Sequence, residues 1–282
     1  MADVLTADPP ADAPEPGAGR CANCGAALHG PFCAACGQAV KPLDPPVRHF
    51  AREFAQELLD VDGRVPRSFK RLLLSPGFLT REHLEGRRVP WLSPLKLYLL
   101  ASVAMFAVLT MIGDSGGVRL FVIGDPNDAD YFHKYGYADF AAMRAAADAA
   151  RVEWTPRVMF VLVPLVGWLV ALARRRSNRR YPAHLVFTLH VYAAAFAARA
   201  VTAGLGAVGP PPLGAGLVAL SGLYFVVYTY AALRRAYGIS RGLAVRDTAI
   251  ITIGAWVALM AGLATVVTIA VFGRYGLGLL RF

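Results

Sequence analysis

Five long apolar stretches follow residue 94, and they constrain the fold of this chain more than any other feature. A helix of about 20 apolar residues crosses a bilayer core, because a helix satisfies its own backbone hydrogen bonds. With 56% hydrophobic and 17% charged residues, the whole chain is also too apolar for an ordinary soluble protein. The sequence therefore predicts an all-α polytopic membrane helix bundle over 94–282. We expect spans at about 95–112, 159–173, 183–208, 213–233 and 248–272.

Cationic residues in the short links between these stretches predict the orientation of the bundle. Arginines gather at 174–180, between the second and third stretches, and at 234–246, between the fourth and fifth. Short loops rich in Lys and Arg stay on the cytoplasmic side of a membrane. We therefore expect the N-terminus inside and the C-terminus outside. These loops also explain the net charge of +10 without a nucleic-acid partner.

The only four cysteines of the chain form two matched pairs near the N-terminus, each followed by a glycine. Four thiolates are the ligand set of a tetrahedral structural zinc ion, and glycine permits the positive φ that such turns often require. Iron or another thiolate-binding metal, two disulfides, or a redox-active pair are the alternatives. The sequence favours a zinc ribbon over 21–40, with structural Zn²⁺ held by Cys21, Cys24, Cys33 and Cys36.

The compartment and the surface of this ribbon follow from its neighbours in sequence. Residues 1–20 lack the basic start and apolar centre of a signal peptide, so we expect an acidic, Pro-rich disordered tail in a reducing cytoplasm. Between the first and the last cysteine there is no Lys or Arg. Since nucleic-acid backbones are bound through cations, we expect no nucleic-acid partner. Phe32 would form a small apolar cap on the ribbon.

A basic segment connects the ribbon to the first span. Residues 41–46 are a Pro-rich linker, and 47–93 read as basic amphipathic juxtamembrane helices over 47–59, 66–74 and 78–85. Such helices often lie among lipid headgroups. The alternative is that they pack on the bundle or on the ribbon, with solvated cations. The residues expected at headgroups are Arg67, Lys70, Arg71, Arg87, Arg88 and Lys96, the last by extending its side chain along the membrane surface.

Polar residues within the third apolar stretch are candidates for an intramembrane site, namely His184, Thr188, His190 and Arg199. The two histidines are six residues apart, which places them about 120° apart around a helix, so one helix cannot chelate a metal with both. Structural packing is one explanation for these residues. A ligand site or a proton path is the other.

Two further features have simple explanations. Asp247 lies near the start of the fifth stretch, where an acid at a helix N-terminus is electrostatically favoured. The aromatic run 131–137, in the long link after the first span, is typical of headgroup anchors. A helix-like Ala-rich stretch follows it at 138–152, still outside the second span.

Several short motifs occur in a recognisable order. The two Cys-x-x-Cys-Gly pairs are followed by Pro76-Gly77, by Gly86-Arg87-Arg88, by Pro94-Leu-Lys-Leu-Tyr98, and by Tyr181-Pro-Ala-His184 at the start of a later span. This order resembles the bacterial membrane family termed domain of unknown function 3667. The resemblance runs from Cys21 to about Tyr192 and is most specific over 75–98. It implies the bacterial inner membrane and no established activity, so it supplies no catalytic residues.

These observations favour a regulatory or scaffold protein whose zinc ribbon docks a cytoplasmic protein partner, with membrane lipids around the bundle. No HExxH, GxSxG or P-loop motif and no pair of intramembrane acids occurs, so we expect no enzyme. The alternative is a small-solute or ion transporter or channel that uses the polar groups of the third span. Five spans without an internal repeat fit poorly with repeat-built transporters, although a homo-oligomer could form a path.

Overall fold

The computed structural model describes residues 19–40, 63–112 and 129–276. Within these ranges the chain is helical, and its only extended pairings are isolated β-bridges in the ribbon. The tail up to residue 18, the linker 41–46 and the expected helix 47–59 lie outside the described residues. The helices are α2 Arg64–Leu74, α3 Phe78–Leu84, α4 Pro94–Met111, α5 Ala129–Lys134, α6 Phe140–Ala173, α7 Tyr181–Ala207, α8 Pro211–Tyr237 and α9 Arg241–Gly276.

Among the described residues, five helices are long and apolar enough to cross a membrane: α4, α6, α7, α8 and α9. This confirms the predicted all-α fold with five spans. Large apolar side chains cover their outer faces; Trp168 of α6 and Trp256 of α9, for example, are 55% and 63% exposed. Apolar surface of this extent suits a lipid environment and is rare on soluble proteins. The chain is therefore a multi-pass membrane protein.

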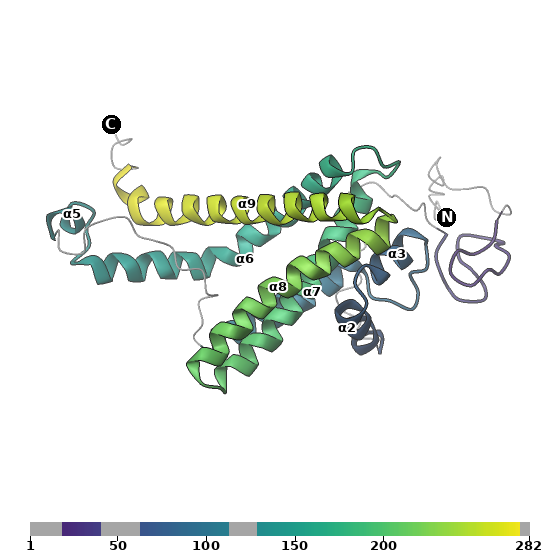
Figure 1. The fold of residues 1–282 in the computed structure, drawn as a ribbon, viewed down its shortest axis with the longest axis horizontal. Coiled ribbons are helices and arrows are strands. Elements are labelled where there is room, and N and C mark those ends of the chain that lie inside the picture. Colours follow the sequence, from purple (N-terminus) through teal and green to yellow (C-terminus); the bar gives the residue numbers. More distant parts are fainter. Residues whose placement is uncertain (1–18, 41–62, 113–128, 277–282) are drawn as a thin grey trace, which may run out of the picture.

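Helix α7 is the centre of the bundle and packs against α4, α6 and α8. Its buried face carries small residues, including Ala193, Ala194 and Ala197, which let neighbouring helices approach closely. Figure 1 shows α9 lying along α6, and α8 lying along α7. The two pairs are close together near α3 and diverge away from it.

Helix α6 extends well before the predicted second span, because it starts at Phe140 and continues through Pro156 and Pro164 for 34 residues, more than the roughly 20 that a bilayer core needs. The charged residues of its first half had suggested a separate segment outside the membrane. A proline within a helix removes one backbone hydrogen bond but need not end the helix when neighbouring donors contribute. Beside the second proline, the Tyr181 hydroxyl of α7 donates to the Pro164 carbonyl at 2.9 Å and connects α7 to α6.

Phe132, Tyr135 and Tyr137 of the aromatic run belong to a small separate core. Phe132 of α5 is buried against Phe140 and Met143 of α6, and the rings of Tyr135 and Phe272 of α9 lie 4.8 Å apart. These contacts join α5 to the ends of α6 and α9, and the expected contact of the run with headgroups stays a prediction.

Helices α2 and α3 pack on the bundle, which was the alternative to their lying among headgroups. The hydroxyls of Tyr228 and Tyr224 in α8 donate to the carbonyls of Leu72 and Leu73 at 2.8 and 3.1 Å, where α2 ends. The backbone of the turn after α2 is in close contact with the backbone of α8. At Gly77 φ is +73°, and an added Cβ would lie 2.6 Å from the Ala232 oxygen. Only glycine fits there.

Candidate functional site

The ribbon consists of two loops with the same backbone hydrogen bonds. In the first, Gly25 N–H donates to Cys21 O and Cys21 N–H donates to Ala26 O, both at 2.8 Å. The second loop repeats this pattern with Gly37, Cys33 and Gln38, again at 2.8 Å. Both glycines have positive φ, at 77° and 71°, as their position after each cysteine pair predicted. The repeated turn brings the two thiols of each pair close together.

The four sulfur atoms converge, since all lie within 4.8 Å of one another. The Sγ atoms of Cys21 and Cys36 are 3.6 Å apart, and those of Cys24 and Cys33 are 3.5 Å apart. These are free thiols, because a disulfide joins its sulfurs at about 2.05 Å. A tetrahedron with metal–sulfur bonds of about 2.3 Å has sulfur–sulfur edges of about 3.8 Å. The cluster therefore fits a metal ion bound by four thiolates.

The electrostatics of the ribbon also favour a cation. The backbone N–H groups of Cys24 and Asn23 stabilise the thiolate of Cys21 and lower its pKa to about 7. At Cys24 the backbone of Ala26 acts in the same direction, but the neighbouring thiols and burial outweigh it and raise the pKa to about 12. A bound cation offsets the repulsion between neighbouring thiolates. Thiolates rather than thiols are the ligands of metal ions. With four protein ligands, such a site has no open position for a substrate or for a catalytic water.

Gln38, directly after the second cysteine loop, holds the ribbon against the link between α3 and α4. Its Nε2 donates to the carbonyl of Gly86 at 2.8 Å, and its Oε1 accepts from the N–H of Arg88 at 3.3 Å. Sequence reasoning missed this role, although the Gln after Cys36-Gly37 was visible. Phe32 is 64% exposed and does not cap the ribbon, because its backbone pairs with Ala39 and its side chain faces outward.

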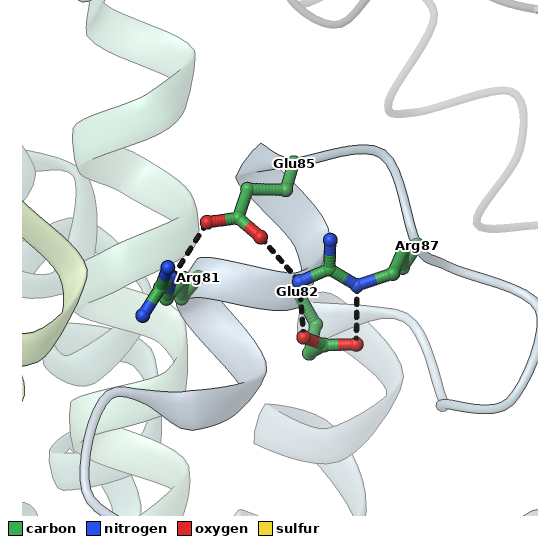
Figure 2. Close-up of polar contacts among 4 residues, drawn as sticks. All are labelled: Arg81, Glu82, Glu85 and Arg87. Carbon is green, nitrogen blue, oxygen red and sulfur yellow. Dashed lines mark hydrogen bonds and ion pairs between the residues drawn. The ribbon is translucent and has the colours of Figure 1, made fainter. Parts of the chain in front are cut away.

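The link that receives the ribbon is fixed by an ion-pair network. Figure 2 shows the guanidinium of Arg87 between the carboxylates of Glu82 and Glu85, with Arg81 on the other side of Glu85. Hydrogen bonds from Arg81 and Arg87 lower the pKa of Glu85, and the bonds to Glu82 and Glu85 raise the pKa of Arg87. Arg87, expected at headgroups, instead ties the link to α3.

The other expected headgroup residues divide into two groups. Arg67, Lys70 and Arg71 are exposed on α2, and their contact with lipid stays a prediction. Lys96 is only 7% exposed, and its contact with headgroups also stays a prediction. It lies in the first turn of α4, on the side that the rest of the bundle covers. Arg88 lines a pocket beside the ribbon and donates from Nε to the carbonyl of His83 at 3.3 Å.

The four polar residues predicted in the third span are not brought together into one site. His184 Nδ1 lies 2.8 Å from the Tyr237 hydroxyl of α8, and Thr188 donates to the His184 carbonyl at 2.9 Å. His190 turns to a different neighbour, the Thr80 hydroxyl of α3. Arg199 lies further along α7 and lines an apolar cavity of about 400 Å³ between the long helices. His184, Thr188 and His190 therefore all make contacts within the bundle.

Asp247 has a larger role than the sequence predicted. It lies in the second turn of α9 rather than at the cap, and its side chain is fully buried. Its carboxylate pairs with Arg174 at 3.3 Å and with Arg246 at 2.7 Å. The pairing joins the end of α6 to α9. An acid beside Arg-rich loops was the one signal in the sequence that could have indicated it.

The fold and the ribbon together define a helical membrane protein with four clustered cysteines, which could bind a metal ion, ahead of its first span. Residues 62–106 match the model of a family described as "Protein of unknown function (DUF3667)". The resemblance inferred from the sequence is thus confirmed over this segment, which comprises α2, α3 and most of α4. The ribbon lies outside the match. No curated protein and no solved structure matched the chain.

Proposed function

We propose that this protein is a regulatory or scaffold protein of the bacterial inner membrane, and that its zinc-loaded ribbon docks a cytoplasmic protein partner. The observation that carries the proposal is the way the ribbon is seated. Gln38 holds one side of it on the membrane domain, while the aromatic ring of Phe32 is 64% exposed. Exposed aromatic side chains on a rigid support are frequent anchors of protein–protein interfaces.

The metal is proposed to be zinc with a structural role. Four thiolates at tetrahedral spacing are typical of structural zinc sites, and they leave no position for catalysis. The proposal includes no enzymatic activity. Metal analysis of the purified protein tests it: we expect one zinc per chain, and none in a Cys21→Ser/Cys24→Ser variant. An unchanged zinc content in the variant would contradict the assignment.

The cytoplasmic placement of the ribbon is supported by the loops around it. The contact between Arg174 and Asp247 brings the links after α6 and after α8 to one end of the bundle. The contacts of α3 with α8 place α3, and the ribbon beside it, at that same end. Both links are rich in arginine, which favours the cytoplasmic side. Reporter fusions after residues 40 and 178 should therefore both give cytoplasmic signals, and an external signal at 178 would overturn the orientation.

Docking is tested with a photo-crosslinking amino acid at Phe32 in native membranes. We expect a discrete crosslinked adduct that disappears when Cys21 and Cys24 are replaced by serine. The matched control carries the crosslinker at Val208, an exposed position at the opposite end of α7. Failure to form an adduct at position 32, or the same adduct from position 208, would contradict docking through the ribbon.

A transporter or channel built on the third span receives less support from the contacts. His184 is hydrogen-bonded to Tyr237, Thr188 to its own helix, and His190 to Thr80. Groups engaged in separate contacts are less suited to passing a solute or proton along one path.

A further inference from the structure

We propose that the space between the ribbon and the membrane domain is a binding pocket for a phosphate-bearing organic ligand. A cavity of about 420 Å³ lies there, walled by the ribbon on one side and by α2, α3 and the α3–α4 link on the other. Its inner end reaches His190 of α7. This volume lies within the range of small-molecule sites in proteins, about 300–1,000 Å³.

The charge of the pocket is the first argument for an anionic ligand. Arg20 of the ribbon, Arg64 of α2, and Arg87 and Arg88 of the link all line the cavity, whereas no Asp or Glu is among its described lining residues. Glu82 and Glu85 offset the charge of Arg87. Arg20, Arg64 and Arg88 are the other cationic residues of the wall, and Cys21 of the cysteine cluster also borders the cavity. Guanidinium groups match phosphate oxygens in geometry and charge.

Two of these arginines are anchored at the wall of the pocket. Arg64 donates from Nη1 to the carbonyl of Val89 at 3.2 Å, and Arg88 donates from Nε to the carbonyl of His83 at 3.3 Å. Both acceptors are backbone atoms of residues that also line the pocket. Anchoring of this kind fixes a side chain before a ligand arrives and lowers the entropic cost of binding.

The remaining walls suit the organic part of the ligand. Leu79, Leu92 and the face of Trp91 are apolar. His83 is neutral, since burial and then the nearby charge of Arg88 lower its pKa well below the ordinary value. A neutral imidazole adds hydrogen bonding without adding charge. Ser93, the N-cap of the 18-residue helix α4, also borders the cavity and brings the positive end of that helix near it.

The pocket differs in two ways from the surface around Phe32 that we propose to dock a protein partner. Its arginines at 64, 87 and 88 and Trp91 all lie within the segment that matches the family, so the pocket belongs mainly to that segment. The ribbon supplies the opposite wall, through Arg20, Ala22 and Gln38. Ligand binding should therefore require the folded, metal-bound ribbon, but not the partner that we propose at Phe32.

The test uses the zinc-loaded full-length protein in nanodiscs of phosphatidylcholine, with inorganic pyrophosphate as the probe and calorimetry as the readout. We expect saturable binding of one pyrophosphate per chain. An Arg64→Gln/Arg88→Gln double variant should bind at least about tenfold more weakly, because it loses charge-assisted hydrogen bonds. The matched control is Arg67→Gln, which removes an exposed arginine of the same helix that does not line the cavity.

A second variant keeps the proposal testable if the double variant fails to fold. Ala22→Trp places a large ring at the ribbon wall and leaves every arginine in position; it should abolish pyrophosphate binding while retaining zinc. Binding that is absent in the wild type, equally weakened by Arg67→Gln, or unaffected by Ala22→Trp would overturn the proposal. The same result would follow if the metal-free protein bound as well as the zinc-loaded one.

A second experiment distinguishes two sources of the phosphate group, a lipid headgroup and a soluble compound. Nanodiscs that contain phosphatidylglycerol are compared with those of phosphatidylcholine alone. If the anionic lipid competes with pyrophosphate in the wild type, and does so equally in Arg67→Gln, which keeps the pocket intact, the ligand is a lipid headgroup. If pyrophosphate binds equally in both, the ligand is a soluble phosphorylated compound.

Discussion

The hydroxyl of Thr80 in α3 lies 3.0 Å from Nδ1 of His190 in α7, and both side chains are buried. This hydrogen bond joins the segment that matches the family to the central span. Thr80→Val keeps the shape of the side chain but leaves a buried ring nitrogen without its partner. We expect a loss of about 1–3 kcal/mol in the free energy of unfolding, measured by denaturant titration in micelles.

The control for this substitution is Thr265→Val, whose exposed hydroxyl donates only to the Ala261 carbonyl of its own helix. Its unfolding free energy should change by less than about 0.5 kcal/mol. Equal effects of the two variants would show that the bond between Thr80 and His190 contributes nothing specific.

Asp247 provides the second prediction, because it is fully buried between two arginines. Asp247→Asn should destabilise the protein by about 3–5 kcal/mol, since it leaves the guanidinium of Arg174, whose side chain is 15% exposed, without its counter-charge. Arg246→Gln removes the more exposed partner, at 54% exposure, and should cost only about 0–1 kcal/mol. The prediction fails if the order of the two effects is reversed in the same unfolding assay.

Two glycines with similar backbone conformation allow the turn after α2 to be tested. Gly77→Ala strains a positive φ and also drives a Cβ to 2.6 Å from the Ala232 oxygen, so we expect a loss of about 2–6 kcal/mol. Gly238→Ala has a similar φ, +63°, but its Cβ meets nothing within 4 Å. Its cost should be only the conformational one, about 1–2 kcal/mol. Equal losses of unfolding free energy would show that the contact between the turn and α8 is not tight.

The contact between the ribbon and the α3–α4 link gives the fourth prediction. Gln38→Ala removes both hydrogen bonds to the α3–α4 link, including the acceptor for the Arg88 N–H. Hydrogen exchange in a peptide that spans residues 86–93 should therefore become faster, while the zinc content stays at the wild-type level. His29→Ala, at an exposed position of the same ribbon, should leave exchange unchanged. Unaltered exchange in the Gln38 variant would show that the ribbon is held in another way.

Much of the architecture was predictable because it depends on local composition. The five apolar stretches locate α4, α6, α7, α8 and α9, since lipid accepts only segments that satisfy their own backbone. The spacing of the cysteines predicted their convergence in the same way, because a Cys-x-x-Cys-Gly turn is built from its own backbone hydrogen bonds. The start of α6 was missed because its charged and proline-containing half has no apolar signal.

The partners of the polar side chains were decided only by the tertiary structure. His184 bonds to Tyr237, 53 residues away, His190 to Thr80, 110 residues away, and Asp247 to Arg174, 73 residues away. No local pattern encodes such pairs. The contact of the ribbon with Gly86 and the adjacent pocket arise in the same way, from the packing of α2 on α7 and of α3 on α7 and α8. The sequence by itself thus determined the spans and the convergence of the four cysteines, while packing decided what each buried polar group contacts.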